Sequence, residues 1–251
     1  MEVPQNIGKY QIKYLISTLL ERRLFLANDP EGNNVIIKES LNNQNEQLKQ
    51  EFEILAKLNH PNIIKPIELI TLNDKYYLIL PRAENDLFEY MKSQTISDQT
   101  IHQIMHSLLS AVQYLNVLGI WHRNICPENI LIFNNNNEKR FVLADFKNAI
   151  NYTGTKNDEF RTKYQYMAPE ISTNKGYTNK IDIWSCGVIM YQLYKHDFPY
   201  KDNSSPETDS LDVTDIPLTA TDLISQMLCV DPEMRCSASE ALNHHYFNKV
   251  H

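Results

Sequence analysis

The sequence predicts an α+β fold with two lobes: a small, mainly-β N-terminal lobe with one long helix, and a larger, mainly-α C-terminal lobe. Up to Arg82, short apolar segments alternate with polar residues and turn signals, a pattern typical of β-strands. Beyond Arg82, apolar residues recur at helical intervals, as on amphipathic helices. Strands followed by helices favour separate β-rich and α-rich parts, joined near Pro81–Asn85.

The N-terminal lobe is expected to hold strands and a single helix. Turn-forming residues gather at Asn28–Asn33, between two segments of alternating polarity. Leu48, Phe52 and Leu55 fall on one face of a helix, and Pro61 disfavours its continuation. The predicted elements are strands within 10–39, a helix over 45–58, and strands over 63–70 and 75–80 joined by a turn at 73–74.

The C-terminal lobe is expected to be built mainly from helices. A long helix is predicted over 98–118 because one face is apolar throughout, and Gly119 is its expected C-terminal stop. The other predicted elements are a helix that starts at 86, short strands over 131–133 and 141–143, and mainly helices from 181 onward.

Composition restricts the classes of function. The net charge of −7 argues against a nucleic-acid or anionic membrane surface. The four cysteines lack metal or redox spacing and are predicted to be free thiols in a reducing compartment. No apolar run reaches membrane-spanning length and the first residues lack a signal peptide's apolar core. A soluble protein of the cytoplasm is expected, with no nucleic-acid or membrane partner.

The segment Trp121–Ile132 resembles the catalytic loop of the eukaryotic protein kinases, whose pattern is H-R-D-x-x-x-x-N. His122, Arg123 and Asn129 occupy their places in that pattern. Asn124 stands at the position of the catalytic aspartate, which in the family accepts the proton of the substrate hydroxyl. An amide carries no charge and does not act as a base at neutral pH, so this position is predicted to be non-functional.

Other motifs extend the resemblance over 10–247, with an N-lobe of about 10–82 and a C-lobe of about 86–247. Lys38 ends a segment similar to V-A-I-K, and Glu51 lies on the following helix, where the family places the partner of that lysine. The remaining motifs are Asp145-Phe146-Lys147 for D-F-G, Ala168-Pro169-Glu170 for A-P-E, Asp182–Gly187 for D-x-W-S-x-G, and Asp231–Arg235 for D-P-x-x-R.

The resemblance implies roles for these residues. ATP and magnesium are the implied ligands, with Asn129 and Asp145 as magnesium ligands. The implied ATP-binding residues are Lys38, Glu51, Pro81, Ala83, Asn129 and Asp145. The implied structural residues are His122, Arg123, Phe146, Glu170, Asp182 and Arg235, with a buried Glu170–Arg235 ion pair.

Departures from the family pattern gather at the implied chemistry. Where the family has G-x-G-x-x-G, the chain reads Ile16–Glu21, and its leucines and glutamate oppose a close approach of phosphates. Cys126 stands where Ser/Thr kinases usually carry a lysine. Lys147 replaces the glycine of D-F-G and is expected to compete with magnesium or to substitute for it, and Lys163 replaces a threonine.

These departures predict a pseudokinase, a regulatory or scaffolding module that binds a protein partner such as an active kinase or its substrate. Two alternatives remain open: an active serine/threonine kinase with an atypical catalytic loop, and an ATP-sensing switch. Thr153, Thr155 and Thr162 lie within the expected reach of Arg123, but the sequence favours ordinary exposed threonines. The acidic stretch 197–215 is expected to be a solvated loop, with docking of a basic partner as the alternative. The oligomeric state is left open.

Overall fold

The structure is a computed structural model, and it describes residues 4–18, 22–41, 45–135, 138–152, 154, 156, 163–172, 176–200, 206 and 209–248, without the side chain of residue 135. The chain forms two compact units. Unit 1 comprises Met1–Glu84 with Asp145–Lys147, and unit 2 comprises Asn85–Ala144 with Asn148–His251. The short segment 145–147 therefore belongs with the N-terminal residues although it begins 61 positions after Glu84 in sequence.

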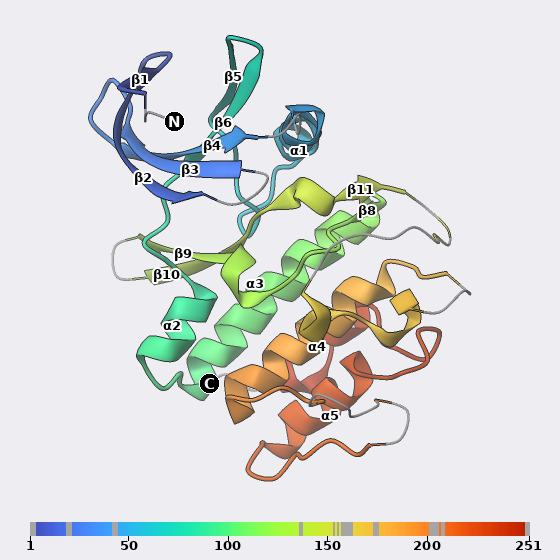
Figure 1. Cartoon of the computed structure of the whole chain (residues 1–251). Coiled ribbons are helices and arrows are strands. Elements are labelled where there is room, and N and C mark those ends of the chain that lie inside the picture. The colour runs from blue at the N-terminus through green and yellow to red at the C-terminus, as the bar shows by residue number, and fades with distance from the viewer. Residues whose placement is uncertain are drawn as a thin grey trace. The chain divides into compact units, whose positions relative to one another are not determined.

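Unit 1 is an antiparallel sheet with one helix (Figure 1). Its described strands form a six-stranded sheet in the order β1-β2-β3-β4-β6-β5. The strands are β1 (Asn6–Ile7), β2 (Tyr10–Thr18), β3 (Arg22–Asn28), β4 (Asn34–Ser40), β5 (Glu68–Leu72) and β6 (Lys75–Pro81). One face of the sheet carries a buried apolar cluster that includes Phe25, Ile37 and Ile79, as the alternation of side chains along strands requires.

The turns of this sheet follow the local chemistry of the sequence. Asn73 and Asp74 both have positive φ, at 51° and 59°, as a tight two-residue hairpin demands. The predicted strand over 63–70 is wrong in its first half, because β5 begins only at Glu68. Ile63 and Ile64 are instead buried outside any strand, so their apolar character serves packing. A short apolar run does not by itself distinguish these two uses.

The predicted helix of unit 1 is α1 (Asn45–Lys57), which packs against β5 and β6. Leu48 and Leu55 lie on its buried face, at helical spacing. Glu51 lies on that same face and is 2% exposed, so the helix carries a carboxylate into the interior of unit 1.

Unit 2 is mainly helical, and the predicted α+β class is confirmed. Its described helices are α2 (Leu87–Ser93), α3 (Asp98–Val117), α4 (Lys180–Lys195), α5 (Leu218–Met227) and α6 (Ala238–Leu242), with 3-10 turns η1 (Pro127–Asn129), η3 (Tyr164–Tyr166), η4 (Pro169–Ser172) and η5 (His245–Asn248). The Ser97 hydroxyl caps α3 by accepting from the Thr100 N–H, and Gly119 follows the helix with a φ of 68°. Most of α4 is buried, which suits the central position it takes in Figure 1 between α3 and α5.

Short strands frame the segment that resembles a catalytic loop. β8 (Ile120–Trp121) pairs with β11 (Ile150–Asn151) on one side of it. β9 (Ile130–Asn135) pairs with β10 (Glu138–Leu143) and β7 (Asn85–Asp86) on the other. Residues 122–129 are thus held at both ends by backbone hydrogen bonds.

Every helix in the described ranges falls short of the length and apolar character that crossing a bilayer requires. The four cysteines are free thiols, as predicted, and Cys126, Cys186 and Cys236 are buried.

Candidate functional site

The loop 122–129 of unit 2 is anchored by a buried aspartate. The backbone N–H groups of His122 and Arg123 donate to the Asp182 carboxylate at 2.7 and 2.9 Å. Burial raises the pKa of Asp182 to about 6, against the opposing effect of those two hydrogen bonds. Arg123 has a φ of 62°, a left-handed conformation that these anchors stabilise. The loop is therefore fixed by α4, the helix that begins with the D-x-W-S-x-G motif.

Side chains of the loop bond to the loop backbone and to the neighbouring residue Ala144. The Asn124 N–H donates to His122 Nδ1 at 3.2 Å, and His122 Nε2 then donates to the carbonyl oxygen of Ala144 at 3.0 Å. The Asn129 amide donates to the Asn124 carbonyl at 2.7 Å. Asn124 is 8% exposed, so an uncharged amide stands in a well-ordered loop at the position of the catalytic aspartate.

A lysine from another segment reaches this loop. The Lys163 ammonium forms an ion pair with the Glu128 carboxylate and lies 5.7 Å from the centre of the Phe88 ring. Burial, together with the Glu128 charge, raises the pKa of the Cys126 thiol to about 12, so this side chain is neutral at physiological pH. The loop thus carries a neutral thiol at position 126 and a lysine charge that Glu128 already neutralises.

Unit 1 gathers four charged side chains in one cluster, the unit 1 ion-pair chain: Arg22, Lys38, Glu51 and Asp145. Lys38 Nζ lies 2.5 Å from Glu51 Oε2 and 2.8 Å from Asp145 Oδ1. Arg22 Nη1 contacts the same Asp145 oxygen at 2.8 Å. The structure thus brings together Lys38, Glu51 and Asp145, three of the residues that the family resemblance implies for ATP binding. Arg22 is a fourth member of the cluster that the resemblance did not imply.

Electrostatics inside this cluster is dominated by burial and by the two cations. Burial tends to raise the pKa of Asp145, but Lys38 and Arg22 outweigh it and hold that pKa well below its ordinary value. Burial and the neighbouring Asp145 charge raise the pKa of Glu51, against the opposing effect of Lys38. The Asp145 anion is therefore stabilised by two cations of the protein, whereas burial destabilises the Glu51 anion.

Sequence reasoning missed Arg22, because only the pairing register of β3 and β4 shows which face of the sheet it takes. Leu24 pairs with Lys38 across β3 and β4, and side chains two residues apart on a strand share a face. Arg22 therefore lies on the face of Lys38. Residues 19–21, the second half of the stretch Ile16–Glu21 that stands in place of the glycine loop, lie outside the described residues. So do Thr153, Thr155, Thr162 and part of the acidic stretch.

Pro81 and Ala83, two of the implied ATP-binding residues, lie at the end of unit 1. Pro81 is the last residue of β6, opposite Val35 of β4, and Ala83 follows it. Unit 2 begins at Asn85. These positions agree with a short connection between the sheet and the helical unit, and their roles in ATP binding stay predictions from the resemblance.

The buried Glu170–Arg235 ion pair implied by the resemblance is present in unit 2. Arg235 Nη1 and Nη2 contact the two Glu170 carboxylate oxygens at 2.6 and 2.9 Å. The same guanidinium donates to the carbonyl oxygens of Cys229 and Lys180. At 1% exposure Arg235 is a structural residue of the helical unit.

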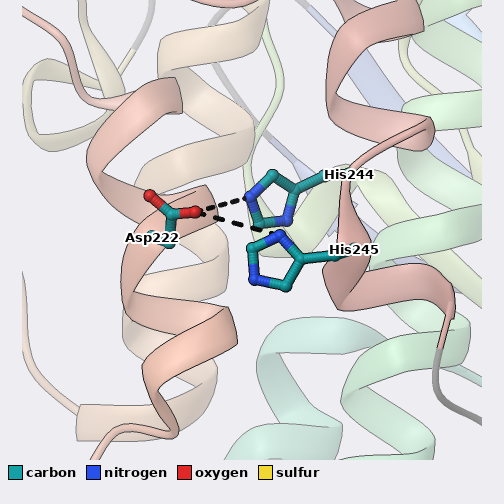
Figure 2. Close-up of side chains that lie close together, drawn as sticks. All are labelled: Asp222, His244 and His245. Carbon is teal, nitrogen blue, oxygen red and sulfur yellow. Dashed lines mark hydrogen bonds and ion pairs between the residues drawn. The ribbon is translucent and has the colours of Figure 1, made fainter.

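A second group of titratable side chains, Asp222 with His244 and His245, joins α5 to the last turn of unit 2 (Figure 2). His244 Nε2 lies 2.9 Å from Asp222 Oδ2, and His245 Nδ1 lies 3.9 Å from it. His244 Nδ1 accepts from the Tyr246 N–H, which leaves the Nε2 proton to donate to Asp222. A metal ligand needs a free nitrogen lone pair, so this arrangement is that of a hydrogen-bonded pair.

Magnesium does not fit Asp145 as the side chains stand. Both cations of the cluster contact the carboxylate oxygen Oδ1, and Lys147 adds a positive charge nearby. A divalent cation at this carboxylate would face these like charges at short range. In unit 2, the Asn129 amide nitrogen donates to the backbone of its own loop, whereas a metal ion would bind the amide oxygen.

Comparison with known proteins agrees with these motifs. The family described as "Protein kinase domain" matches residues 27–247. Serine/threonine-protein kinase cds1 of Schizosaccharomyces pombe is 30% identical, over 100% of this chain and 55% of its own length. Calcium/calmodulin-dependent protein kinase type 1 of Macrobrachium nipponense is 28% identical, over 97% of this chain and 76% of its own.

A probable myosin light chain kinase of Dictyostelium discoideum is 32% identical, over 80% of this chain and 55% of its own length. The chain thus spans about half the length of two of these three relatives. The family match covers both the Asp182-anchored loop of unit 2 and Lys38, Glu51 and Asp145 of unit 1. The chain belongs to the protein kinase domain family.

Proposed function

We propose that this protein kinase domain is a pseudokinase: a regulatory or scaffolding module in which phosphoryl transfer is absent or very weak. The observation that carries the proposal is Asn124, a buried and uncharged amide at the position of the catalytic aspartate. A positioned general base contributes about 10²–10⁴ in rate, and the Asn124 side chain has no basic group to supply it.

The surroundings of Asn124 support the same conclusion. Phosphoryl transfer depends mainly on positioning and on charges that stabilise the transferred group. Cys126 is a neutral thiol, and the nearby Lys163 charge is paired with Glu128. A cation already bound to a carboxylate contributes less to a transferring phosphate.

An active serine/threonine kinase with an atypical loop is the second candidate. Two observations favour it: relatives at 28–32% identity carry kinase names, and Lys38 is already paired with Glu51. ATP would then contact the residues that the family resemblance assigns to it, including Lys38 and the backbone near Pro81 and Ala83. An ATP-sensing switch, in which bound nucleotide biases partner binding, is an intermediate candidate.

The decisive experiment is a phosphotransfer assay on the purified full chain with labelled ATP and general protein substrates. The pseudokinase proposal expects the wild-type rate to equal that of an Asp145→Asn control. Substrate labelling by the wild-type chain that Asp145→Asn abolishes would establish the active-kinase candidate instead. In a parallel Asn124→Asp variant, a rise of about 10²–10⁴ would assign the loss to the missing base alone.

A thermal-shift titration with ATP, with and without magnesium, separates a scaffold from a nucleotide sensor. A ligand at 100 times its Kd adds about 2.7 kcal/mol to the folded state, which is several degrees for a chain of this size. A shift that Lys38→Met removes supports the sensor. Equal melting temperatures in all buffers support a scaffold without nucleotide.

The proposed partner is a protein, such as an active kinase or its substrate, and the proposed location is the cytoplasm. The net charge of −7 and the free thiols are consistent with both. Affinity capture followed by reciprocal binding of purified partners tests the first, and imaging of a tagged chain tests the second.

A further inference from the structure

Arg22 is a charged residue of unit 1 for which the family motifs give no role. It is the first residue of β3, and its side chain is 22% exposed. Its Nη1 atom contacts Asp145 Oδ1 at 2.8 Å, the same oxygen that Lys38 contacts at 2.8 Å. Two protein cations thus share one carboxylate oxygen.

The ion-pair chain of unit 1 is neutral without an added ion. Arg22 and Lys38 supply two positive charges, and Asp145 and Glu51 supply two negative ones. The Asp145 side chain is 11% exposed and Glu51 is 1% exposed, so water screens these charges weakly. A further dication at Asp145 would leave the cluster with uncompensated positive charge.

The space beside the cluster is small. Among the described residues, Arg22, Lys38, Glu51 and Lys147 help to line a cavity of about 20 Å³. Such a volume accommodates about one water molecule, and Asp145 is not among the described residues that line it. Arg22 Nε is buried without a hydrogen-bond partner among the described residues, so the contact with Asp145 is what orients this guanidinium.

We propose that Arg22 is a built-in counter-ion of Asp145. Its guanidinium occupies the position beside Asp145 Oδ1 and thereby prevents a divalent metal ion from binding to this carboxylate. The wild-type chain then binds no magnesium or manganese through Asp145, and removing the Arg22 charge creates a divalent-cation site. This inference is separate from the proposed loss of phosphoryl transfer, which rests on Asn124 in unit 2.

The test is direct binding of Mn²⁺ to the full chain, with the free ion measured by electron paramagnetic resonance. Four proteins are compared: wild type, Arg22→Gln, Arg22→Lys, and the double variant Arg22→Gln/Asp145→Asn. Arg22→Gln keeps a polar side chain without charge, and Arg22→Lys keeps the charge. The expected result is a gain in Mn²⁺ affinity of about tenfold or more in Arg22→Gln alone, the size of effect that neighbours of metal ligands have.

Each other outcome overturns the proposal. In one such outcome, the wild type binds Mn²⁺ and a single Asp145→Asn substitution abolishes that binding. This result would show that Arg22 does not exclude the metal. The comparison does not require Arg22→Gln to fold. Equal affinity of a folded Arg22→Gln and the wild type would show that another feature blocks the site. Binding to Arg22→Gln that persists in the double variant would place the ion elsewhere. None of these readouts depends on phosphotransfer activity.

Discussion

Lys38→Met is expected to destabilise unit 1 whether or not the protein binds ATP. Lys38 is the link between two carboxylates, at 2.5 Å from Glu51 and 2.8 Å from Asp145. After the substitution, Asp145 retains Arg22, but Glu51 is left with no cation in direct contact among its described ion pairs. Glu51 is 1% exposed as a side chain, so bulk water solvates its charge poorly.

The magnitude follows from the cost of an unpaired buried charge. Breaking one side of a buried ion pair costs about 3–5 kcal/mol. For a chain of 150–250 residues, each kcal/mol lowers the melting temperature by about 2–4 °C, so the loss is on the order of 10 °C. The methionine keeps the volume of the lysine stem, which limits any additional loss from a cavity.

The pH dependence of this loss has a definite sign. The pKa of Glu51 is raised in the folded state by burial and by Asp145. A carboxyl whose pKa is raised in the folded state contributes to the free energy of unfolding at pH values below its pKa in the unfolded chain, about 4.3. That contribution is lost as the pH rises through the pKa of the folded state. Since Lys38→Met raises the pKa further, the difference from wild type is expected to grow from pH 5 to pH 8.

The assay must report on unit 1. Both tryptophans, Trp121 and Trp184, lie in unit 2, so tryptophan fluorescence would follow the wrong unit. Hydrogen exchange of β4 and α1, or calorimetry, measures the intended transition. The matched control is Lys38→Met/Glu51→Gln, which removes the unpaired charge and should recover part of the stability. A loss below about 1 kcal/mol, or no recovery in the double variant, would refute the reasoning.

Three further predictions concern unit 2. Arg235→Leu is expected to cost about 3–5 kcal/mol, because it removes the guanidinium that pairs with the buried Glu170 carboxylate. Glu170→Gln in the same chain should return part of this loss, and tryptophan fluorescence in urea measures both. Gly187→Ala is expected to cost about 1–3 kcal/mol, since its Cβ would lie 2.9 Å from neighbouring side chains, and an unchanged urea midpoint would contradict this. Cys126, buried and with a pKa of about 12, should alkylate at pH 8 more slowly than the half-buried Cys229; mass spectrometry of timed samples gives the order.

Local patterns in the sequence were sufficient for most elements. Helical spacing located α1 and α3 to within one residue at their C-terminal ends, since the predicted ends at 58 and 118 compare with Lys57 and Val117. Turn chemistry placed the hairpin at Asn73 and Asp74. The pattern misplaced the start of β5, because Ile63 and Ile64 are buried without being part of a strand.

The sequence by itself determined the family resemblance, the loss of the base at Asn124 and the presence of Lys38, Glu51 and Asp145. These are identities at fixed spacing, and they need no knowledge of contacts. Only the tertiary structure decided which cations meet which carboxylates. Arg22 pairs with Asp145 across 123 positions and Lys163 with Glu128 across 35, and such pairs arise from strand register and chain reversal. Residue spacing carries no record of them, because the electrostatic energy of a side chain depends on its distance in space and on burial.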